Sequence, residues 1–155
     1  MPSPNPQGRL QATIEIECSP KEVWGILGDF EEVELWAPGI TDAYRTTGPD
    51  IDVGSRRTVH YRHLFRMEQV VTEWTEGKSL TYDVFKTPWP LRNFQETWTL
   101  TPSVSGARVH TEVEYELWFG KVGRFVNWIF TRHVLSFEMR AGQRGLKRKV
   151  ETGHP

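Results

Sequence analysis

The segment Ser19-Pro-Lys-Glu-Val-Trp-Gly-Ile-Leu-Gly-Asp-Phe30 carries the signals that begin a short helix. Ser19 is a favourable N-cap residue, and Pro20 suits the first helical position, where no backbone N–H is needed. Glu22 stands three residues after Ser19, the spacing of a capping box. Apolar residues follow at helical spacing, at Val23, Trp24, Ile26, Leu27 and Phe30. The segment therefore predicts an amphipathic helix with one buried face.

The flanks of this helix carry different patterns. Residues 10–16 alternate apolar and polar side chains, the period of a half-buried strand. Residues 31–35 indicate a second short helical piece, which ends before Ala37-Pro38-Gly39 because proline and glycine stop helices. A strand, a helix and a short helical piece are therefore expected in this order.

The middle of the chain contains six runs rich in Thr, Val, Tyr, Trp and Phe, residues that favour strands. The runs cover about 40–47, 54–62, 64–74, 78–86, 92–101 and 107–117, and turn-forming residues separate them. In the last run, Val109, Val113 and Leu117 lie on one parity and His110 and three glutamates on the other. One face of that strand is expected to be buried and the other solvated.

After Gly120 the apolar period lengthens to that of a helix of about 121–151. Its apolar stripe includes Val122, Phe125, Val126, Ile129, Phe130, His133, Val134, Phe137 and Ala141. Its last turns carry five cations between Arg140 and Lys149, which are favourable near the negative end of a helix dipole. Contact with an anionic membrane or nucleic acid is the alternative role for these cations, and a solvated helix end is preferred.

The order of elements predicts an α+β fold of one domain. Consecutive strands joined by short turns form a curved, seven-stranded antiparallel sheet, and the long C-terminal helix covers one of its faces. We expect residues 1–8 to be a disordered lead-in, residues 9–151 to be the domain and residues 152–155 to be a tail.

Composition excludes several classes of protein. The chain has 155 residues, a net charge of −1, a pI of about 6.5 and a mean hydropathy of −0.52. It has no apolar run long enough to span a membrane, no signal-peptide pattern and a single cysteine, Cys18. A cytoplasmic protein without nucleic-acid or integral membrane contact is expected. Aromatic residues nevertheless make up 12% of the chain, and rigid rings suit the walls of a binding pocket.

The segment Ser19–Phe30 resembles the first helix of the START-like (SRPBCC) superfamily, in its polyketide cyclase/dehydrase-like branch. Further similar motifs follow in the same order, at Trp36-Ala-Pro-Gly39, Gly54-Ser-Arg-Arg57, Trp74-Thr-Glu-Gly-Lys78, Trp98-Thr-Leu-Thr-Pro102 and Leu146-Lys-Arg-Lys-Val-Glu151. The resemblance covers about residues 10–151. It implies the helix-grip fold, in which the C-terminal helix and the curved sheet enclose a mostly apolar cavity. Members of the superfamily bind lipids, sterols, polyketides or hormones, and some catalyse cyclisation or dehydration.

Carboxylates are the strongest candidates for chemistry in such a cavity. If Val70 faces inward, Glu68 shares its face, and if Leu100 faces inward, Glu96 and Trp98 share that face. Tyr82 would then lie between the two glutamates. A buried carboxylate has a raised pKa, which suits general acid/base work. Arg56, His60 and Arg62 share one parity on an earlier strand, so arginine–glutamate pairs inside the cavity are possible. The alternatives to a catalytic role are that these pairs are structural, or that a bulge turns one of the strands over and points its glutamate outward.

Other candidates carry less chemistry. His133 lies on the apolar stripe of the last helix, as a core histidine or as a ligand or acid/base group. Cys18 precedes a helix N-terminus, which lowers a thiol pKa, although a small buried thiol is the preferred interpretation. No pattern of metal ligands, nucleophile elbow or nucleotide-binding loop is present, so neither metal nor cofactor is expected.

Aromatic residues complete the expected site. Most of them are expected in the core, and those predicted to contact ligand are Trp98, Phe125, Trp128 and Phe137. Trp89 lies in the loop Pro88-Trp-Pro-Leu91, where a large ring is expected to cap a pocket mouth. Trp36 precedes Ala37-Pro38 and is expected to be a similar ring in a loop.

The sequence leaves three functions open. The first is binding of a small hydrophobic or aromatic ligand, such as a lipid, quinone or polyketide-like molecule. The second is a cofactor-independent aromatase/cyclase or dehydratase that uses Glu68, Glu96 or His133. The third is a protein-interaction module that uses Trp89 and the basic helix end. A homodimer is compatible with all three.

Overall fold

The capping signals at Ser19 and Glu22 begin helix α1 (Pro20–Leu27) as predicted. The Ser19 N–H donates to Glu22 Oε2 at 2.8 Å, and the Glu22 N–H donates to Ser19 Oγ at 3.3 Å. Val23, Trp24 and Leu27 form the buried face of the helix. The second helical piece is shorter than predicted, a single 3₁₀ turn, η1 (Val33–Leu35).

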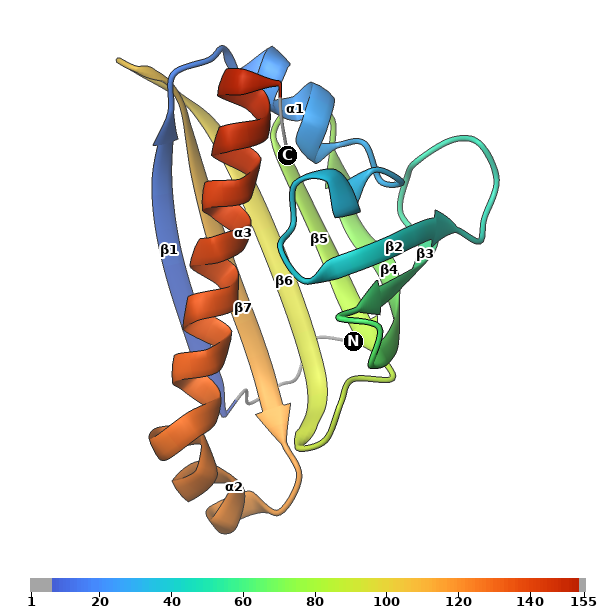
Figure 1. Cartoon of the computed structure of the whole chain (residues 1–155), viewed down its shortest axis with the longest axis vertical. Helices are drawn as coiled ribbons and strands as arrows, with labels where there is room; N and C mark the ends of the chain where they lie inside the picture. The colour runs from blue at the N-terminus through green and yellow to red at the C-terminus, as the bar shows by residue number, and fades with distance from the viewer. Residues whose placement is uncertain (1–6, 154–155) are drawn as a thin grey trace.

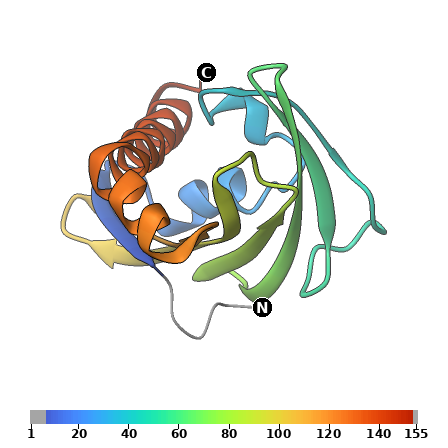
Figure 2. The same ribbon diagram turned by 90° about the horizontal axis from the view of Figure 1, so that it is seen from below.

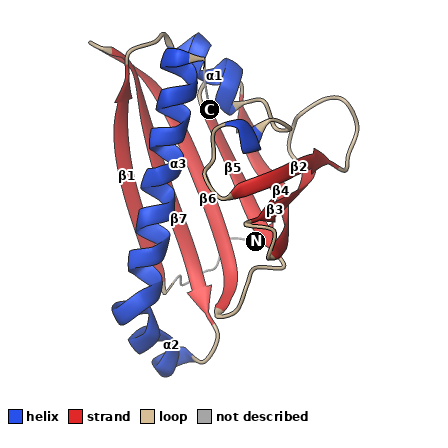
Figure 3. Ribbon diagram, in the orientation of Figure 1, coloured by secondary structure: helices blue, strands red, loops and turns tan. Residues whose placement is uncertain are grey.

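The computed structural model describes residues 7–153, and these contain one seven-stranded antiparallel sheet (Figures 1 and 3). Its strands are β1 (Gly8–Ile16), β2 (Ile40–Arg45), β3 (Arg56–Tyr61), β4 (Phe65–Thr75), β5 (Ser79–Phe85), β6 (Leu91–Ser103) and β7 (Gly106–Leu117). They lie in the order β1-β7-β6-β5-β4-β3-β2, so the first strand pairs with the last. The sheet curves around the helices, as Figure 2 shows.

The C-terminal helix runs without interruption from Gly120 to Thr152, in agreement with the predicted range of 121–151. It consists of α2 (Gly120–Val126), one π-helical turn, η2 (Asn127–Thr131), and α3 (Arg132–Thr152). The π-helical turn was not predicted. A π-helical turn adds about one residue to the helix and rotates every later side chain by about 100°. None of the helices within residues 7–153 is long and apolar enough to cross a membrane.

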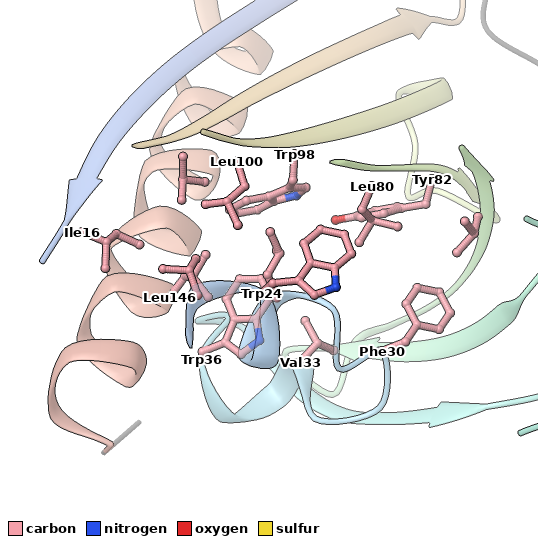
Figure 4. Packing of buried hydrophobic residues seen from close by; sticks show 14 of the residues in the cluster. Ile16, Trp24, Phe30, Val33, Trp36, Leu80, Tyr82, Trp98, Leu100 and Leu146 are labelled. Carbon is pink, nitrogen blue, oxygen red and sulfur yellow. The ribbon is translucent and has the colours of Figure 1, made fainter. Parts of the chain in front are cut away.

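The main core lies where α1 and the C-terminal half of α3 meet the sheet (Figure 4). Ile16, Leu100 and Leu146 come from β1, β6 and α3, and each is almost fully buried. The rings of Trp36 and Trp98 pack edge to face with centroids 5.5 Å apart. At Gly145, a Cβ atom would lie 1.9 Å from the Trp36 carbonyl oxygen, so this close approach requires glycine. Trp36, predicted as a loop ring at the rim, is therefore a buried core residue whose ring also borders the cavity.

The ends of the domain differ from the prediction. Gly8 already belongs to β1, the Gln7 N–H donates to the Tyr115 carbonyl at 3.1 Å, and Gln7 Oε1 accepts from the Leu117 N–H at 3.0 Å. The disordered lead-in predicted for residues 1–8 is wrong for these two residues, because β7 offers their backbone hydrogen-bond partners. Residues 1–6 lie outside the described residues. Thr152 closes α3, and residues 154–155 of the predicted tail are likewise not described.

Candidate functional site

Alternation along three strands directs a set of polar side chains to the concave face of the sheet. On β3, Arg57 shares its face with Val59; on β5, Tyr82 lies between Leu80 and Val84. On β6, Glu96 lies two residues before Trp98. Because β5 and β6 pair with Tyr82 opposite Glu96, the phenol and the carboxyl are cross-strand neighbours.

These side chains line a cavity of about 410 Å³ between the sheet and the middle of the long helix, residues 130–142. Its wall is mostly apolar and includes Val59, Met67, Val84, Phe94, Leu135 and Met139. The polar groups of the wall are fewer and include Arg57, Gln69, Tyr82 and Glu96. A concave, mostly apolar space of this size with a few convergent polar groups is typical of a small-molecule site.

Hydrogen bonds hold the polar groups of the wall in place. The Tyr82 hydroxyl donates to Glu96 Oε2 at 2.6 Å. The buried Arg57 guanidinium donates to Gln69 Oε1 at 2.6 Å and to the Phe30 carbonyl at 3.0 Å. Its Cζ also lies 4.2 Å from the centre of the Phe30 ring and 5.4 Å from that of Tyr82. The cluster therefore presents one cation and one carboxyl at the same wall.

Burial shifts the pKa of both members of the tyrosine–glutamate pair. It raises the pKa of Glu96, although the Tyr82 hydroxyl and the Arg57 charge act in the opposite direction. It also raises the pKa of Tyr82 well above its usual range, and the adjacent Glu96 charge adds to this. The Trp98 side chain also acts to lower the pKa of that carboxyl, although its Nε1 has no hydrogen-bond partner among residues 7–153. Figure 4 shows the Tyr82 hydroxyl and the Trp98 nitrogen pointing toward one another.

The mouth of the cavity is formed by the loop between β5 and β6, by Tyr61 and Phe65 at the two ends of the β3–β4 turn, and by the long helix. Trp89 in the first loop and Phe130 on the helix line the cavity and are also strongly exposed, at 72% and 65%. On another side of the mouth, Arg62 Nη2 lies 2.9 Å from Glu138 Oε1 and so joins the β3–β4 turn to α3. Arg62 also donates to the Tyr61 hydroxyl at 3.0 Å.

The family model for polyketide cyclase/dehydrase and lipid transport proteins matches residues 7–151. The chain belongs to this family. The resemblance drawn from its motifs and the helix-grip α+β fold are thus both confirmed. Membership of the polyketide cyclase/dehydrase and lipid transport family implies a ligand-binding cavity.

Solved structures with the same fold agree over nearly the whole chain. A protein of Thermus thermophilus is 16% identical, with 94% of this chain and 99% of that chain covered and a TM-score of 0.71. Ara h 8.0201 is 10% identical, with 94% and 98% covered and a TM-score of 0.73. The di-domain ARO/CYC StfQ of the steffimycin biosynthetic pathway is 12% identical, with 92% of this chain and 50% of that chain covered and a TM-score of 0.77. No curated protein matches the chain in sequence.

Four of the predicted site residues do lie on the cavity wall: Tyr82, Glu96, Trp98 and Trp89. Tyr82 and Glu96 are in direct contact, and Trp89 is at the mouth as its loop position predicts. Their roles toward a ligand stay predictions.

Glu68 lies outside the cavity. On β4 the inward residues are Met67, Gln69 and Val71, so the parity predicted from Val70 is wrong. The register of β4 shifts between Val71 and Glu73, and this bulge returns Trp74 to the inward face beyond it. Glu68 instead forms an outer salt bridge with Lys86 at 2.6 Å, and this bond lowers the pKa of its carboxyl.

Four residues of the long helix are also placed differently from the prediction. The helix turns Thr131, Leu135 and Met139 toward the cavity. The side chains predicted to contact ligand there are exposed and absent from the cavity wall; they are Phe125, Trp128, His133 and Phe137. The prediction assumed that the most apolar stripe faces the sheet, but the helix begins beyond the end of β7, and the π-helical turn changes which stripe faces inward (Figure 1).

Sequence reasoning missed Arg57 and Gln69. It assigned the inward parity of β3 to Arg56, His60 and Arg62, whereas Arg57, Val59 and Tyr61 line the cavity. Val59, an apolar residue between Arg57 and Tyr61, was the available signal. His60 lies instead 3.4 Å from Asp42 outside the cavity.

Cys18 and the basic end of the long helix, two further candidates from the sequence, are not on the cavity wall. Cys18 is half-buried, and burial together with nearby Glu22 raises the pKa of its thiol, so it is not an activated nucleophile. Within residues 7–153, no three potential metal ligands are grouped together.

The basic helix end makes structural contacts: Lys147 donates to the Glu15 carbonyl at 2.8 Å and Lys149 to the Gly153 carbonyl at 3.2 Å.

Proposed function

We propose that this protein binds one small, mostly apolar molecule in the cavity between the sheet and the long helix. The observation that carries the proposal is the 410 Å³ apolar cavity with the Tyr82–Glu96 pair and Arg57 fixed on its wall. Apolar walls supply affinity through surface removed from water, and the few polar groups supply orientation.

The polar groups define what the ligand must carry. Trp36 Nε1 and Thr131 Oγ1 are buried at the cavity wall and have no hydrogen-bond partner among residues 7–153. A buried donor without a partner is costly, and a ligand oxygen that accepts from it removes the cost. A protonated Glu96 is a further donor. The proposed ligand is therefore an apolar or aromatic molecule with carbonyl, ether or hydroxyl oxygens, such as a lipid, quinone or polyketide-like compound.

Native mass spectrometry together with tryptophan-fluorescence titration tests the proposal. We expect one bound molecule per chain from at least one of these three ligand classes. Met67→Trp should fill the cavity and abolish binding, because Met67 lies on its wall. Phe85→Trp is the matched control, since Phe85 is exposed and absent from the cavity wall. No saturable binding, or equal binding by both variants, would contradict the proposal.

A second candidate function, general acid/base catalysis of a cyclisation or dehydration, is favoured by one observation. Glu96 has a raised pKa and a hydroxyl partner 2.6 Å away, inside a mostly apolar cavity. In this function Glu96 moves the proton and Tyr82 orients the carboxyl. Glu96→Gln should then abolish turnover of a polyketide-like substrate while binding persists. Normal turnover by the variant would exclude Glu96 as the acid/base group, and absence of turnover by the wild type would leave binding as the function.

A further inference from the structure

The long C-terminal helix and the segment just before it expose a patch of large rings. We define the aromatic patch as the exposed rings of residues 118–137 together with Trp89. The rings of that segment are Trp118, Phe119, Phe125, Trp128, Phe130 and Phe137, and they are 48–68% exposed. An exposed apolar surface of this kind marks an interaction site.

The members of the aromatic patch belong to one region of the molecule. The Trp118 N–H donates to the Pro90 carbonyl at 3.0 Å, which holds the end of β7 beside the Trp89 loop. Trp89 and Phe130 lie at the same cavity mouth. In Figure 2 the start of the long helix and the β5–β6 loop lie at the same end of the molecule. Trp89 and Phe130 therefore stand at the mouth itself, and the other rings of the patch belong to the segment that adjoins it along the chain.

The charged residues within the segment 118–137 are all cations, and the nearest acid after it, Glu138, is paired with Arg62. Residues 118–137 contain Lys121, Arg124 and Arg132 and no aspartate or glutamate. These three cations are exposed and form no salt bridge with the acids of the described chain. Arg92 adds a further cation, 5.1 Å from the centre of the Trp118 ring.

We infer that the aromatic patch docks this protein on the surface of an anionic phospholipid bilayer, with the cavity mouth toward the lipid. Trp and Phe rings insert at the boundary between headgroups and acyl chains, and nearby Lys and Arg pair with anionic headgroups. A second copy of the chain fits less well. In a symmetric dimer the patch would face itself and bring like charges together without an acid of the segment to neutralise them.

Vesicle flotation tests the inference with phosphatidylcholine vesicles, with and without phosphatidylglycerol. We expect binding that requires phosphatidylglycerol and weakens with salt. The charge variant Lys121→Glu/Arg124→Glu should lose at least about fivefold in partitioning for each cation removed. The ring variant Phe125→Ser/Trp128→Ser should lose binding while keeping its melting temperature, because both rings are exposed.

Matched controls lie away from the aromatic patch. Arg148→Glu changes an exposed cation near the other end of the same helix, and Val104→Ser changes an exposed apolar residue in the β6–β7 turn. Neither should change partitioning. Absence of vesicle binding, or equal loss in the controls, overturns the inference. So does a wild-type dimer in analytical ultracentrifugation that the ring variant dissociates while neither protein binds vesicles.

Tryptophan quenching by brominated phosphatidylglycerol gives a second readout. Trp89, Trp118 and Trp128 are exposed in this region, whereas Trp24, Trp36 and Trp98 are buried. Docking should quench the exposed group, and Trp128→Phe should reduce the quenched fraction. Failure of ligand binding in the cavity would leave these results unchanged, so the two proposals are tested separately.

Discussion

At the scale of single residues, Arg57 is a charge that the fold has removed from water. Its guanidinium lies between the Phe30 ring and Tyr82 and donates to Gln69 and to the Phe30 backbone. Burial lowers its pKa, while the nearby Tyr82 and Glu96 act in the opposite direction. The planar guanidinium satisfies several acceptors at fixed angles while it stacks on a ring, which a lysine ammonium cannot do.

Arg57→Ala should lower the free energy of unfolding by about 2–4 kcal/mol, because Gln69 and the Phe30 carbonyl lose a partner in a buried site. Urea denaturation measures the change. The adjacent Arg56→Ala is the matched control, since Arg56 is exposed on the opposite face and should cost less than about 0.5 kcal/mol. Equal effects at the two positions would contradict the inward assignment of Arg57.

Glu96→Gln should change the pH dependence of stability. Above pH 4.5, the ordinary pKa of glutamate, the unfolded wild type releases the Glu96 proton while the folded state, with its raised pKa, retains it. The wild type therefore loses stability as pH rises through the folded pKa, and the variant does not. Denaturant midpoints measured across pH should diverge in favour of the variant above pH 4.5 and run parallel below it.

The control for this experiment is Glu68→Gln. The hydrogen bond from Lys86 lowers the pKa of Glu68, so its contribution to stability is present above pH 4.5 and is lost as pH falls. The difference between this variant and the wild type should have the opposite sign and be small, because Glu68 lies on the outer surface. The same sign at both positions would show that Glu96 is not held in an apolar environment.

At the scale of elements, the long helix contacts the rest of the fold through small residues. Gly145 allows its backbone to reach the Trp36 carbonyl, and one turn earlier Gly142 faces Trp98. Gln143 adds a polar anchor, since its Nε2 donates at 2.9 Å both to the Ala12 carbonyl and to Thr111 Oγ1. These contacts fix the C-terminal half of the helix, and the residues from Phe130 to Gly142 cover the cavity.

Gly145→Ala should destabilise the protein by about 1–3 kcal/mol, because the new methyl group would overlap a backbone carbonyl that cannot move aside. Gly142→Ala is the matched change. Its methyl group would lie 3.8 Å from Trp98, an ordinary contact, and alanine favours a helix over glycine by up to about 1 kcal/mol. Thermal unfolding should show a lower melting temperature for Gly145→Ala than for Gly142→Ala, by at least several degrees. Equal melting temperatures would refute the close packing at Gly145.

At the scale of the whole molecule, the fold is divided between a filled end and a hollow end. The rings of Trp24, Trp36 and Trp98 and the C-terminal half of α3 fill one end. At the other end the same sheet and helix enclose the cavity. Arg62, on the turn after β3, pairs there with Glu138 of the cavity wall, and we expect a ligand to enter between the sheet and the long helix at this point.

Arg62→Ala should accelerate ligand exchange through this mouth. An exposed ion pair is worth about 0.2–1 kcal/mol, so the dissociation rate should rise up to about fivefold while the affinity changes less. Stopped-flow tryptophan fluorescence measures both rates with a ligand found in the titrations proposed above. High salt should produce the same acceleration in the wild type and none in the variant. An unchanged rate would show that ligands enter elsewhere.

Local signals along the chain were enough to predict the kinds of element, their order and the family. The capping box at Ser19, the period of two along residues 107–117 and the longer period after Gly120 are such signals, and local backbone chemistry decides them. The inward position of Glu96 and Tyr82 followed in the same way, because β5 and β6 pair with each other without a bulge between Ser79 and Val84.

Which faces are functional depends instead on long-range packing, and local patterns did not predict it. A bulge after Val71 lets Trp74 face inward although Glu68 and Val70, of the same parity, face outward, and a π-helical turn before α3 changes the stripe that faces the cavity. One added residue in a strand or helix leaves the hydrophobic pattern almost unchanged, yet it reverses or rotates every side chain beyond it. The exposure of the rings of residues 118–137 is likewise a matter of long-range packing, because the rest of the described chain does not cover them.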